Sequence, residues 1–549
     1  MIDNFAIELT DIDKRFGSVH ANNKVCLQVR QGNIHGIVGE NGAGKSTLMS
    51  ILYGFYQADS GQIDVLGQSY RFTDSHQAIA AGIGMVHQHF MLVENFTVLE
   101  NVILGCEGGA LLADGLAAAR KELTRLADEY GLKVDLDATI DTLSVGSQQR
   151  VEILKALYKG AKILILDEPT GVLTPQETEE LFRIFDALKQ QGVTIMLITH
   201  KLREIMSITD QVSVMRAGQM VAHRDTQDTS REELAELMVG RKVLLQVDKN
   251  PANVLAPLLK IKDLTVADSQ GVERLKQVSF ELRAGEVLGV AGVSGNGQTE
   301  LLEALSGIVP MTSGSIEVLG FKMDAQHPLT PDRLRELGLA HVPEDRHRMG
   351  LITDFSARES ALLGYHTDPN INSGIWLSSS KVETNCQSLM KAFDVRPADP
   401  HLKSANFSGG NQQKLILARE MERNPEVLLI GQPTRGVDIG AIEFIHQRII
   451  DMRDAGKAVL LVSVELDEIM SVSDRIIVLC DGEISGRIDA ADADERTLGL
   501  MMANALDPID LAPIDTAPIG SAPLDPLQAI DDHLAPATQT VSKATNQET

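Results

Sequence analysis

A glycine-rich stretch with one lysine is the clearest sign of chemistry in this sequence. Residues 39–47 read Gly-Glu-Asn-Gly-Ala-Gly-Lys-Ser-Thr, after an apolar run at 34–38 and before a helical pattern at 48–52. Glycines let backbone N–H groups surround phosphate oxygens, and a following helix adds the positive end of its dipole. Lys45 can reach the β- and γ-phosphates, and the Ser46 hydroxyl suits Mg²⁺. We therefore expect this first glycine loop to hold a nucleotide through Gly39, Asn41, Gly42, Gly44, Lys45, Ser46 and Thr47.

Acidic side chains and a histidine follow two later apolar runs. Asp167 and Glu168 come directly after residues 163–166, and His200 follows residues 194–198. A carboxylate at the end of a buried strand can hold the Mg²⁺ shell, which suits Asp167, and the next carboxylate, Glu168, can orient and polarise an attacking water. Such a pair alone is also typical of a solvated turn, but a glycine loop upstream favours catalysis.

Helix signals separate these runs. Residues 97–100 form a capping-box pattern, and Leu116, Leu123, Leu126 and Tyr130 recur at helical spacing before Gly131. Residues 143–150, Leu-Ser-Val-Gly-Ser-Gln-Gln-Arg, lead into another helix. We call them the first signature segment.

The same order of motifs returns in the second half of the chain. A second glycine loop, residues 292–299, follows the apolar run 287–291, and residues 407–414 form a second signature segment. Residues 428–434 match the strand before Asp167, and 356–359 form a second capping-box pattern. A separation of 264 residues recurs between Ser144 and Ser408, Pro169 and Pro433, and His200 and Val464. A nearly constant separation indicates a duplicated domain.

The length and composition limit the classes of protein. The chain has 549 residues and is 43% hydrophobic, enough for two or three domains with sizeable cores. A net charge of −26 argues against non-specific binding of nucleic acid or anionic lipid. The cysteines (Cys26, Cys106, Cys386 and Cys480) lie far apart, which favours neither disulfides nor a zinc site and fits a reducing compartment. With no signal-peptide pattern and no long apolar run, we expect a cytoplasmic chain.

These patterns predict domain boundaries. We expect a first domain at 1–240, a linker at 241–257 containing Pro251 and Pro257, and a second domain at 258–503. Residues 504–549 are rich in Ala, Pro and Asp without helical spacing, and we expect a disordered acidic tail there.

The combined motifs resemble those of the ATP-binding subunits of ABC transporters, over about residues 5 to 500. Two fused copies with a degenerate second glycine loop are similar to the importer ATPases for simple sugars and nucleosides. Residues 88–95 and 343–347 look most like the nucleoside branch. The resemblance implies an α/β fold with two tandem P-loop NTPase (ABC ATPase) domains. Each would have a mainly parallel sheet core and a helical subdomain carrying its signature segment.

The resemblance also implies roles for single residues. Gln88 would touch Mg²⁺ and report the nucleotide state to a membrane partner, and His200 would contact the γ-phosphate. Phe16, which we expect to precede the first core strand, matches an adenine-stacking aromatic, although a simple core role is an equal alternative. In this family two domains enclose ATP head to tail, so the first nucleotide would also meet Ser408, Gly409, Gly410, Gln412 and Asp438.

This head-to-tail arrangement makes the departures from the pattern informative. The second glycine loop has Gln298 and Thr299 for the lysine and serine, and the later motifs have Gly431-Gln432, Val464 and Glu344 for Asp-Glu, His and Gln. The signature that this loop would face has Val145 for a glycine, and Thr174 stands at the place of the loop aspartate. Every departure falls in one composite site. We therefore expect one hydrolysing site, and a second site that at most binds nucleotide.

The resemblance implies ATP hydrolysis, with Mg²⁺, that powers nucleoside import. Partners would be two integral membrane permeases, which alone contact the membrane, and an extracytoplasmic substrate-binding protein. The chain would lie at the cytoplasmic face. The region 344–346 would face the permease, although a solvated charged turn is an equal alternative.

Simple sugars are the alternative cargo. A different class, ribosome-associated tandem ABC ATPases, would be expected to have two complete sites, a long charged linker and basic surfaces for RNA. A DNA-repair ATPase is disfavoured by the same negative charge, so we expect no nucleic-acid partner.

Overall fold

The computed structural model describes most of the chain up to residue 504. The described residues are 4–17, 19–87, 91–105, 112–171, 173, 175–199, 201–242, 249–293, 295–369, 371–373, 376–437 and 439–504. The predictions for Gln88, Thr174, His200, Asp438 and the tail from residue 505 concern residues outside these ranges. We call residues 4–242 the N-terminal half and residues 249–504 the C-terminal half.

The N-terminal half has a six-stranded sheet in the order β10-β9-β3-β8-β7-β6 and a four-stranded sheet in the order β2-β1-β4-β5. The strands are β1 (Phe5–Phe16), β2 (Val19–Arg30), β3 (Ile34–Val38), β4 (Ser60–Val65), β5 (Gln68–Tyr70), β6 (Ile83–Val86), β7 (Ile163–Asp167), β8 (Thr194–Ile198), β9 (Gln211–Arg216) and β10 (Gln219–Asp225). The helices are α1 (Lys45–Leu52), α2 (Ser75–Ala80), α3 (Val98–Ile103), α4 (Leu112–Tyr130), α5 (Val145–Tyr158), α6 (Pro175–Gln190), α7 (Leu202–Ile208) and α8 (Arg231–Val239).

The C-terminal half repeats this plan, with sheets in the orders β16-β19-β20-β13-β21-β22 and β12-β11-β14-β15. The strands are β11 (Pro257–Ala267), β12 (Glu273–Arg283), β13 (Val287–Gly292), β14 (Ser313–Val318), β15 (Phe321–Asp324), β16 (Leu339–Val342), β17 (Asn372–Ser373), β18 (Trp376–Leu377), β19 (Val427–Gly431), β20 (Ala458–Val462), β21 (Arg475–Cys480) and β22 (Glu483–Asp489). The helices are α9 (Gln298–Leu305), α10 (Pro331–Glu336), α11 (Ala357–Leu362), α12 (Ser379–Ala392), α13 (Gly409–Met421), α14 (Ile439–Asp454), α15 (Leu466–Val472) and α16 (Glu495–Met502).

The six-stranded sheets are mainly parallel, as the sequence predicted. In the N-terminal half the pairs β6–β7, β7–β8, β8–β3 and β3–β9 are parallel, and only the edge pair β9–β10 is antiparallel. The antiparallel four-stranded sheets were not predicted. Their long first strands contain irregular steps in register, which interrupt the alternation of apolar and polar residues that would have marked them.

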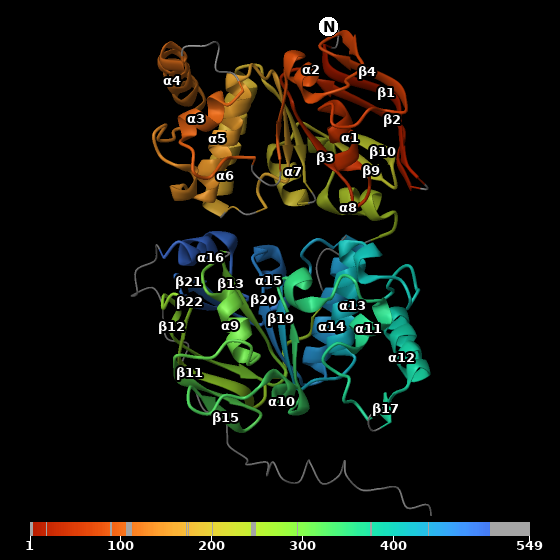
Figure 1. The fold of residues 1–549 in the computed structure, drawn as a ribbon, viewed down its shortest axis with the longest axis vertical. Coiled ribbons are helices and arrows are strands. Elements are labelled where there is room, and N and C mark those ends of the chain that lie inside the picture. Colours follow the sequence, from red (N-terminus) through yellow and green to blue (C-terminus); the bar gives the residue numbers. More distant parts are fainter. Residues whose placement is uncertain are drawn as a thin grey trace, which may run out of the picture. The chain divides into compact units, whose positions relative to one another are not determined.

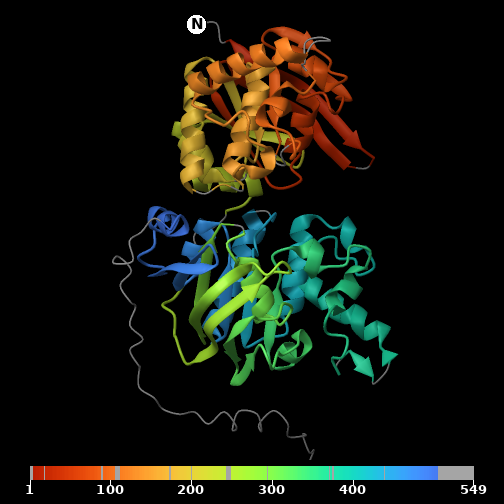
Figure 2. The ribbon, with the colours of Figure 1, turned by 60° about the vertical axis from the view of Figure 1, so that its left-hand side comes forward.

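The helices that carry the signature segments form a separate layer. In each half, Figure 1 shows α3–α5, or α11–α13, on the opposite side of the parallel sheet from the antiparallel strands. Figure 2 shows the same separation for α11–α13 of the C-terminal half. The predicted helical signature subdomain is therefore present in both halves.

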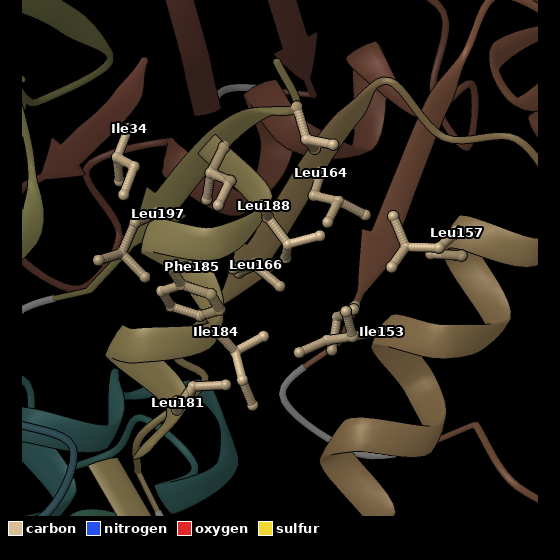
Figure 3. Close-up of a cluster of buried hydrophobic side chains, with 14 of the residues drawn as sticks. Ile34, Ile153, Leu157, Leu164, Leu166, Leu181, Ile184, Phe185, Leu188 and Leu197 are labelled. Atoms are coloured by element: carbon tan, nitrogen blue, oxygen red, sulfur yellow. The ribbon is translucent and has the colours of Figure 1, made fainter. Parts of the chain in front are cut away.

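The core explains why the parallel strands read as unbroken apolar runs. Every residue of β3 and β8 is buried, as are the first four residues of β7. Figure 3 shows Ile153 and Leu157 of α5 and Phe185 and Leu188 of α6 against Leu164 and other strand residues. A parallel strand covered on both faces has no polar face to show in the sequence.

The predicted helix ends are confirmed. Thr97 and Glu100 form a capping box at the start of α3, and Ser356 and Glu359 form one at the start of α11. Helix α4 ends at Tyr130, and Gly131 follows with a φ of 71°. Among the described residues, no helix combines the length and apolar character needed to span a membrane.

A buried histidine in β3 makes stability depend on pH. His35 is 3% exposed, and its Nε2 lies 2.7 Å from the Ser213 hydroxyl oxygen. Burial, together with the nearby charge of His223, lowers the pKa of His35 to about 3. An unfolded histidine takes up its proton near pH 6.5, whereas the folded His35 stays neutral, so stability present above pH 6.5 is lost as the pH falls.

We expect the His35→Gln variant to lose less stability on acidification than the parent. Between pH 7 and pH 5.5 the parent should lose about 1 kcal/mol of unfolding free energy through this group, and the variant should not. Urea unfolding at both pH values measures the difference. His341, whose pKa burial lowers to about 4, still titrates in the variant, so some pH dependence remains. Equal pH dependence in the two proteins would contradict the assignment.

Candidate functional site

The first glycine loop joins β3 to α1 in a shape that only glycine allows. Gly42 and Gly44 have φ values of 80° and 100°, in the left-handed region that other residues rarely adopt. A Cβ atom on Gly44 would lie 2.2 Å from the Ala21 carbonyl oxygen, and one on Gly39 would lie 2.2 Å from the Met215 carbonyl oxygen. Around Gly42 the space is open, with nothing within 4 Å of a built Cβ. The loop is therefore packed from behind and open on one side.

The Lys45 ammonium is buried beside this loop. Its side chain starts at the first residue of α1 and is 6% exposed. The Nζ atom donates to the Gly39 and Glu40 carbonyl oxygens, at 2.6 and 3.0 Å. Burial lowers the pKa of Lys45, while the charges of Glu168, Asp167 and Glu40 act in the opposite direction. The next residue, Ser46, is exposed at the start of the helix.

Two consecutive carboxylates lie at the end of strand β7, which is separated from β3 by β8 in the sheet. Burial and the Glu168 charge raise the pKa of Asp167 to about 6, and the Lys45 ammonium opposes this shift. Glu168 has a φ of 48°, and its N–H donates to the Ile198 carbonyl oxygen at the end of β8, at 2.8 Å. A left-handed glutamate at a strand end is a local strain of the kind that clusters at functional sites. The structure thus brings Lys45, Asp167 and Glu168 together electrostatically.

Phe16 is exposed and has an aromatic partner that sequence reasoning missed. It is the last residue of β1 and precedes β3, the first strand of the parallel core sheet. The residue is 42% exposed, and its ring stands edge-on to that of Tyr56, with centroids 5.2 Å apart. A core role for Phe16 is therefore wrong. Tyr56 lies four residues beyond α1, where no periodic pattern marked it.

The second glycine loop keeps the backbone shape and loses the cation. Gly295 and Gly297 have φ values of 93° and 99°, close to the pattern of the first loop. Gln298 is 3% exposed, and its Nε2 would lie 2.5 Å from a Cβ atom built on Gly292. The amide therefore lies beside Gly292, as the ammonium of Lys45 lies beside Gly39. Within the described part of the chain, no hydrogen-bond partner is found for this Nε2 atom.

Glu344 fills the space that the missing aspartate leaves. A Cβ atom on Gly431, the residue equivalent to Asp167, would lie 2.5 Å from Glu344 Cγ. The Glu344 carboxylate accepts a hydrogen bond from the Thr299 hydroxyl. Sequence comparison showed both substitutions but not that they compensate each other. The available signal was that a glycine, Gly431, stands at the place of Asp167 while a glutamate, Glu344, stands at the place of Gln88.

The signature segments start helices in both halves. Ser408 caps α13 by accepting a hydrogen bond from the Asn411 N–H, and Gln412 is buried and donates to the Ser404 carbonyl oxygen at 2.9 Å. Arg346 bridges this helix to the loop after β19, since it donates to the Gln412 side chain and to the Arg435 carbonyl oxygen. In the first signature segment, Ser144 caps α5 and Val145 is 41% exposed. How Ser408, Gly409, Gly410 and Gln412 meet the first nucleotide stays a prediction.

The fold and the two glycine loops define the class of this protein, and its similarity to known proteins defines the family. Each half has a mainly parallel sheet and a glycine loop, which is followed by a buried lysine in the first half and a buried glutamine in the second. These features define a tandem nucleotide-binding fold. The chain belongs to the ABC transporter family, whose model matches residues 22–171 and again 275–435. The activity that goes with this family is ATP hydrolysis.

The chain is similar to curated relatives over nearly their whole length. It is 46% identical to the nucleoside import ATP-binding protein NupA of Lactococcus lactis, covering 91% of this chain and 99% of the relative. It is also 46% identical to the guanosine import ATP-binding protein NupO of Bacillus subtilis, covering 91% and 98%. Identity is 43% to the glucose import ATP-binding protein TsgD13 of Haloferax volcanii, covering 91% and 96%.

We expect Gly44→Ala to be far more damaging than Gly42→Ala, although both residues have positive φ. Each variant meets the backbone cost of about 1–2 kcal/mol. Gly44→Ala also forces a methyl group against the Ala21 carbonyl, which adds about 1–3 kcal/mol. Denaturant unfolding without nucleotide measures both variants. Equal destabilisation would show that the Ala21 contact does not constrain the loop.

Proposed function

We propose that this chain hydrolyses ATP at one of two nucleotide sites and thereby drives nucleoside import through separate membrane permeases. The observation that carries the proposal is the difference between the two glycine loops. The first has a buried ammonium at Lys45 and carboxylates at Asp167 and Glu168. The second has amides at Gln298 and Gln432 and no side chain at Gly431.

The residues of the first loop fit Mg-ATP. An exposed Ser46 hydroxyl and the Asp167 carboxylate are oxygen ligands of the kind that Mg²⁺ prefers, and Gln88 would complete this set. The bound ion would neutralise phosphate charge. The open side at Gly42 leaves room for phosphates against the N-terminus of α1, with Gly39, Asn41, Gly44 and Thr47 as the other loop contacts.

The remaining residues would position the reactants. Lys45 would balance charge on the β- and γ-phosphates, and Glu168 would orient and polarise the attacking water. His200 would contact the γ-phosphate. Phe16, exposed at the end of β1, would stack on adenine.

The second signature segment would close the first site from the other half of the chain. Its contributors would be Ser408, Gly409, Gly410, Gln412 and Asp438, in a head-to-tail pairing. Contacts between the halves support this. Helix α6 contacts α16, and α8 contacts α14. Because α6 is the repeat equivalent of α14 and α8 that of α16, these contacts are the two expected from a two-fold arrangement.

The importer role determines which partner proteins this chain would need. Two permeases would span the membrane and a substrate-binding protein would deliver cargo, while this chain sits at the cytoplasmic face. Phe55, whose ring stacks on that of His87, is exposed, as are Met91 and Val93, which follow residues 88–90 along the chain. These exposed apolar side chains support contact with another protein. Nucleosides are favoured as cargo by the two relatives at 46% identity, and the glucose-importing relative at 43% favours a simple sugar as the second candidate.

We expect Lys45→Ala to lower ATP turnover by at least about 100-fold, because a positioned cation at the phosphates is lost. Gln298→Ala is the matched control at the equivalent position and should keep turnover within about two-fold. Glu168→Gln should behave like Lys45→Ala. Phosphate release by the purified chain measures all three. Full activity of Glu168→Gln would contradict the assignment of the hydrolysing site.

We expect cells carrying Lys45→Ala to lose uptake of labelled nucleosides and to keep uptake of labelled simple sugars. The matched Gln298→Ala cells should resemble the parent. If sugar uptake were lost instead, the assignment as an importer ATPase would stand and the assigned cargo would change to a simple sugar. Unchanged uptake of both would contradict the importer role.

A further inference from the structure

Three pairs of equivalent positions in the two halves carry opposite charges. The pairs are Lys201 and Glu465, Arg203 and Asp467, and Arg231 and Glu495, and each spans the 264 residues of the repeat. The basic members lie in or just before α7 and α8 of the N-terminal half. The acidic members lie at the corresponding places of α15 and α16. All three positions are thus positive in one half and negative in the other.

These charges meet one another across the two halves. Lys201 Nζ lies 3.2 Å from Glu465 Oε2, and Arg203 Nη1 lies 3.2 Å from Asp467 Oδ1. Each of these ion pairs joins a residue to its own repeat equivalent, which happens only close to a two-fold axis. Arg203 also pairs with Glu495, and Arg231 Nη2 lies 3.7 Å from Asp467 Oδ2.

Whether the facing charges attract or repel therefore depends on which halves meet. An N-terminal half facing a C-terminal half sets three bases against three acids. Two N-terminal halves of different chains, meeting in the same way, would set three bases against three bases. Like charges in contact are destabilising, and interfaces use them to exclude wrong partners.

We propose that this charge pattern is a pairing code, which selects the C-terminal half as the partner of the N-terminal half and excludes a second N-terminal half. The proposal rests on the proposed function, because the hydrolysing site needs the second signature segment opposite Lys45. Two N-terminal halves would instead bring Lys45 to the first signature segment, where Val145 replaces a glycine. The code thus excludes a pairing that would lack the second signature segment opposite Lys45.

A fortuitous meeting of surface charges is the competing explanation. The side chains are 25–54% exposed, and a single exposed ion pair contributes little. A random surface would not, however, reverse the sign at every position that meets its own equivalent. The joint effect of several such contacts should be measurable, and it should weaken as salt screens the charges.

Reversing the charges in one half tests the code in the full chain. The N-reversed variant is Lys201→Glu/Arg203→Glu/Arg231→Glu, and the C-reversed variant is Glu465→Lys/Asp467→Lys/Glu495→Lys. The double-reversed variant carries all six changes. The matched control, Lys121→Glu/Lys133→Glu/Lys162→Glu, makes the same change of charge at exposed lysines elsewhere in the N-terminal half.

Crosslinking between α6 and α16 reports the pairing without ATP. A Cβ atom on Gly499 would lie 2.6 Å from the Gln176 side chain, so a Gln176→Cys/Gly499→Cys pair should crosslink within one chain. The native cysteines are replaced in every protein of this series. The crosslinking rate is measured with a short bis-maleimide at low and high salt, and ATP hydrolysis is measured in parallel.

We expect each single-half reversal to slow intramolecular crosslinking by about five-fold or more at low salt. The double-reversed variant should return to within about two-fold of the parent, and the control should match the parent. Unchanged crosslinking in the single reversals, or no recovery in the double reversal, would overturn the code. If crosslinking follows the code while ATP hydrolysis is absent in the parent, the proposed function fails and the code stands.

Discussion

The site depends on one buried cation beside two carboxylates at the carboxyl ends of the parallel strands β3 and β7, which are separated by β8. Lys45 has lost most of its water, which lowers its pKa, and the charges of Asp167 and Glu168 oppose that loss. Removing one partner of a buried charge set typically costs about 3–5 kcal/mol, because the remaining charge is left uncompensated. The glycine loop, the strand order and the turn at Glu168 together hold this arrangement.

The C-terminal half shows how such a set changes as a unit. A lysine replaced alone would leave an aspartate in a poorly solvated place without its cation. Here Gln298 is neutral and Gly431 has no side chain, so both partners are gone. Glu344 occupies the freed space and is hydrogen-bonded to Thr299. The cation and the aspartate are therefore absent together, while the Glu344 carboxylate in this space is held by a hydroxyl group rather than by an ammonium.

Much of the fold followed from local sequence signals, and the rest depends on contacts that such signals do not carry. Buried parallel strands, glycine loops and capping boxes each have a short-range pattern, so β3, β7, α3 and α11 could be predicted. The antiparallel sheets could not, because bulges break their alternation. The aromatic pair of Phe16 and Tyr56 could not either, since nothing local joins residues 40 positions apart. The charges on α7 and α15 became meaningful only when the repeat was aligned and the two elements were found in contact.

The turn after the last strand residue has the same shape in both halves, although the side chain differs. Gln432 has a φ of 47°, nearly that of Glu168, and its N–H donates to the Val462 carbonyl as that of Glu168 donates to Ile198. The strained backbone is therefore set by the joint between neighbouring strands, whichever side chain stands there. On this joint, the charged groups at the strand end can be exchanged for neutral ones through changes of side chain alone. The backbone is therefore indifferent to the charge at this position, so a half that lacks the lysine and both carboxylates keeps the sheet order of its charged counterpart.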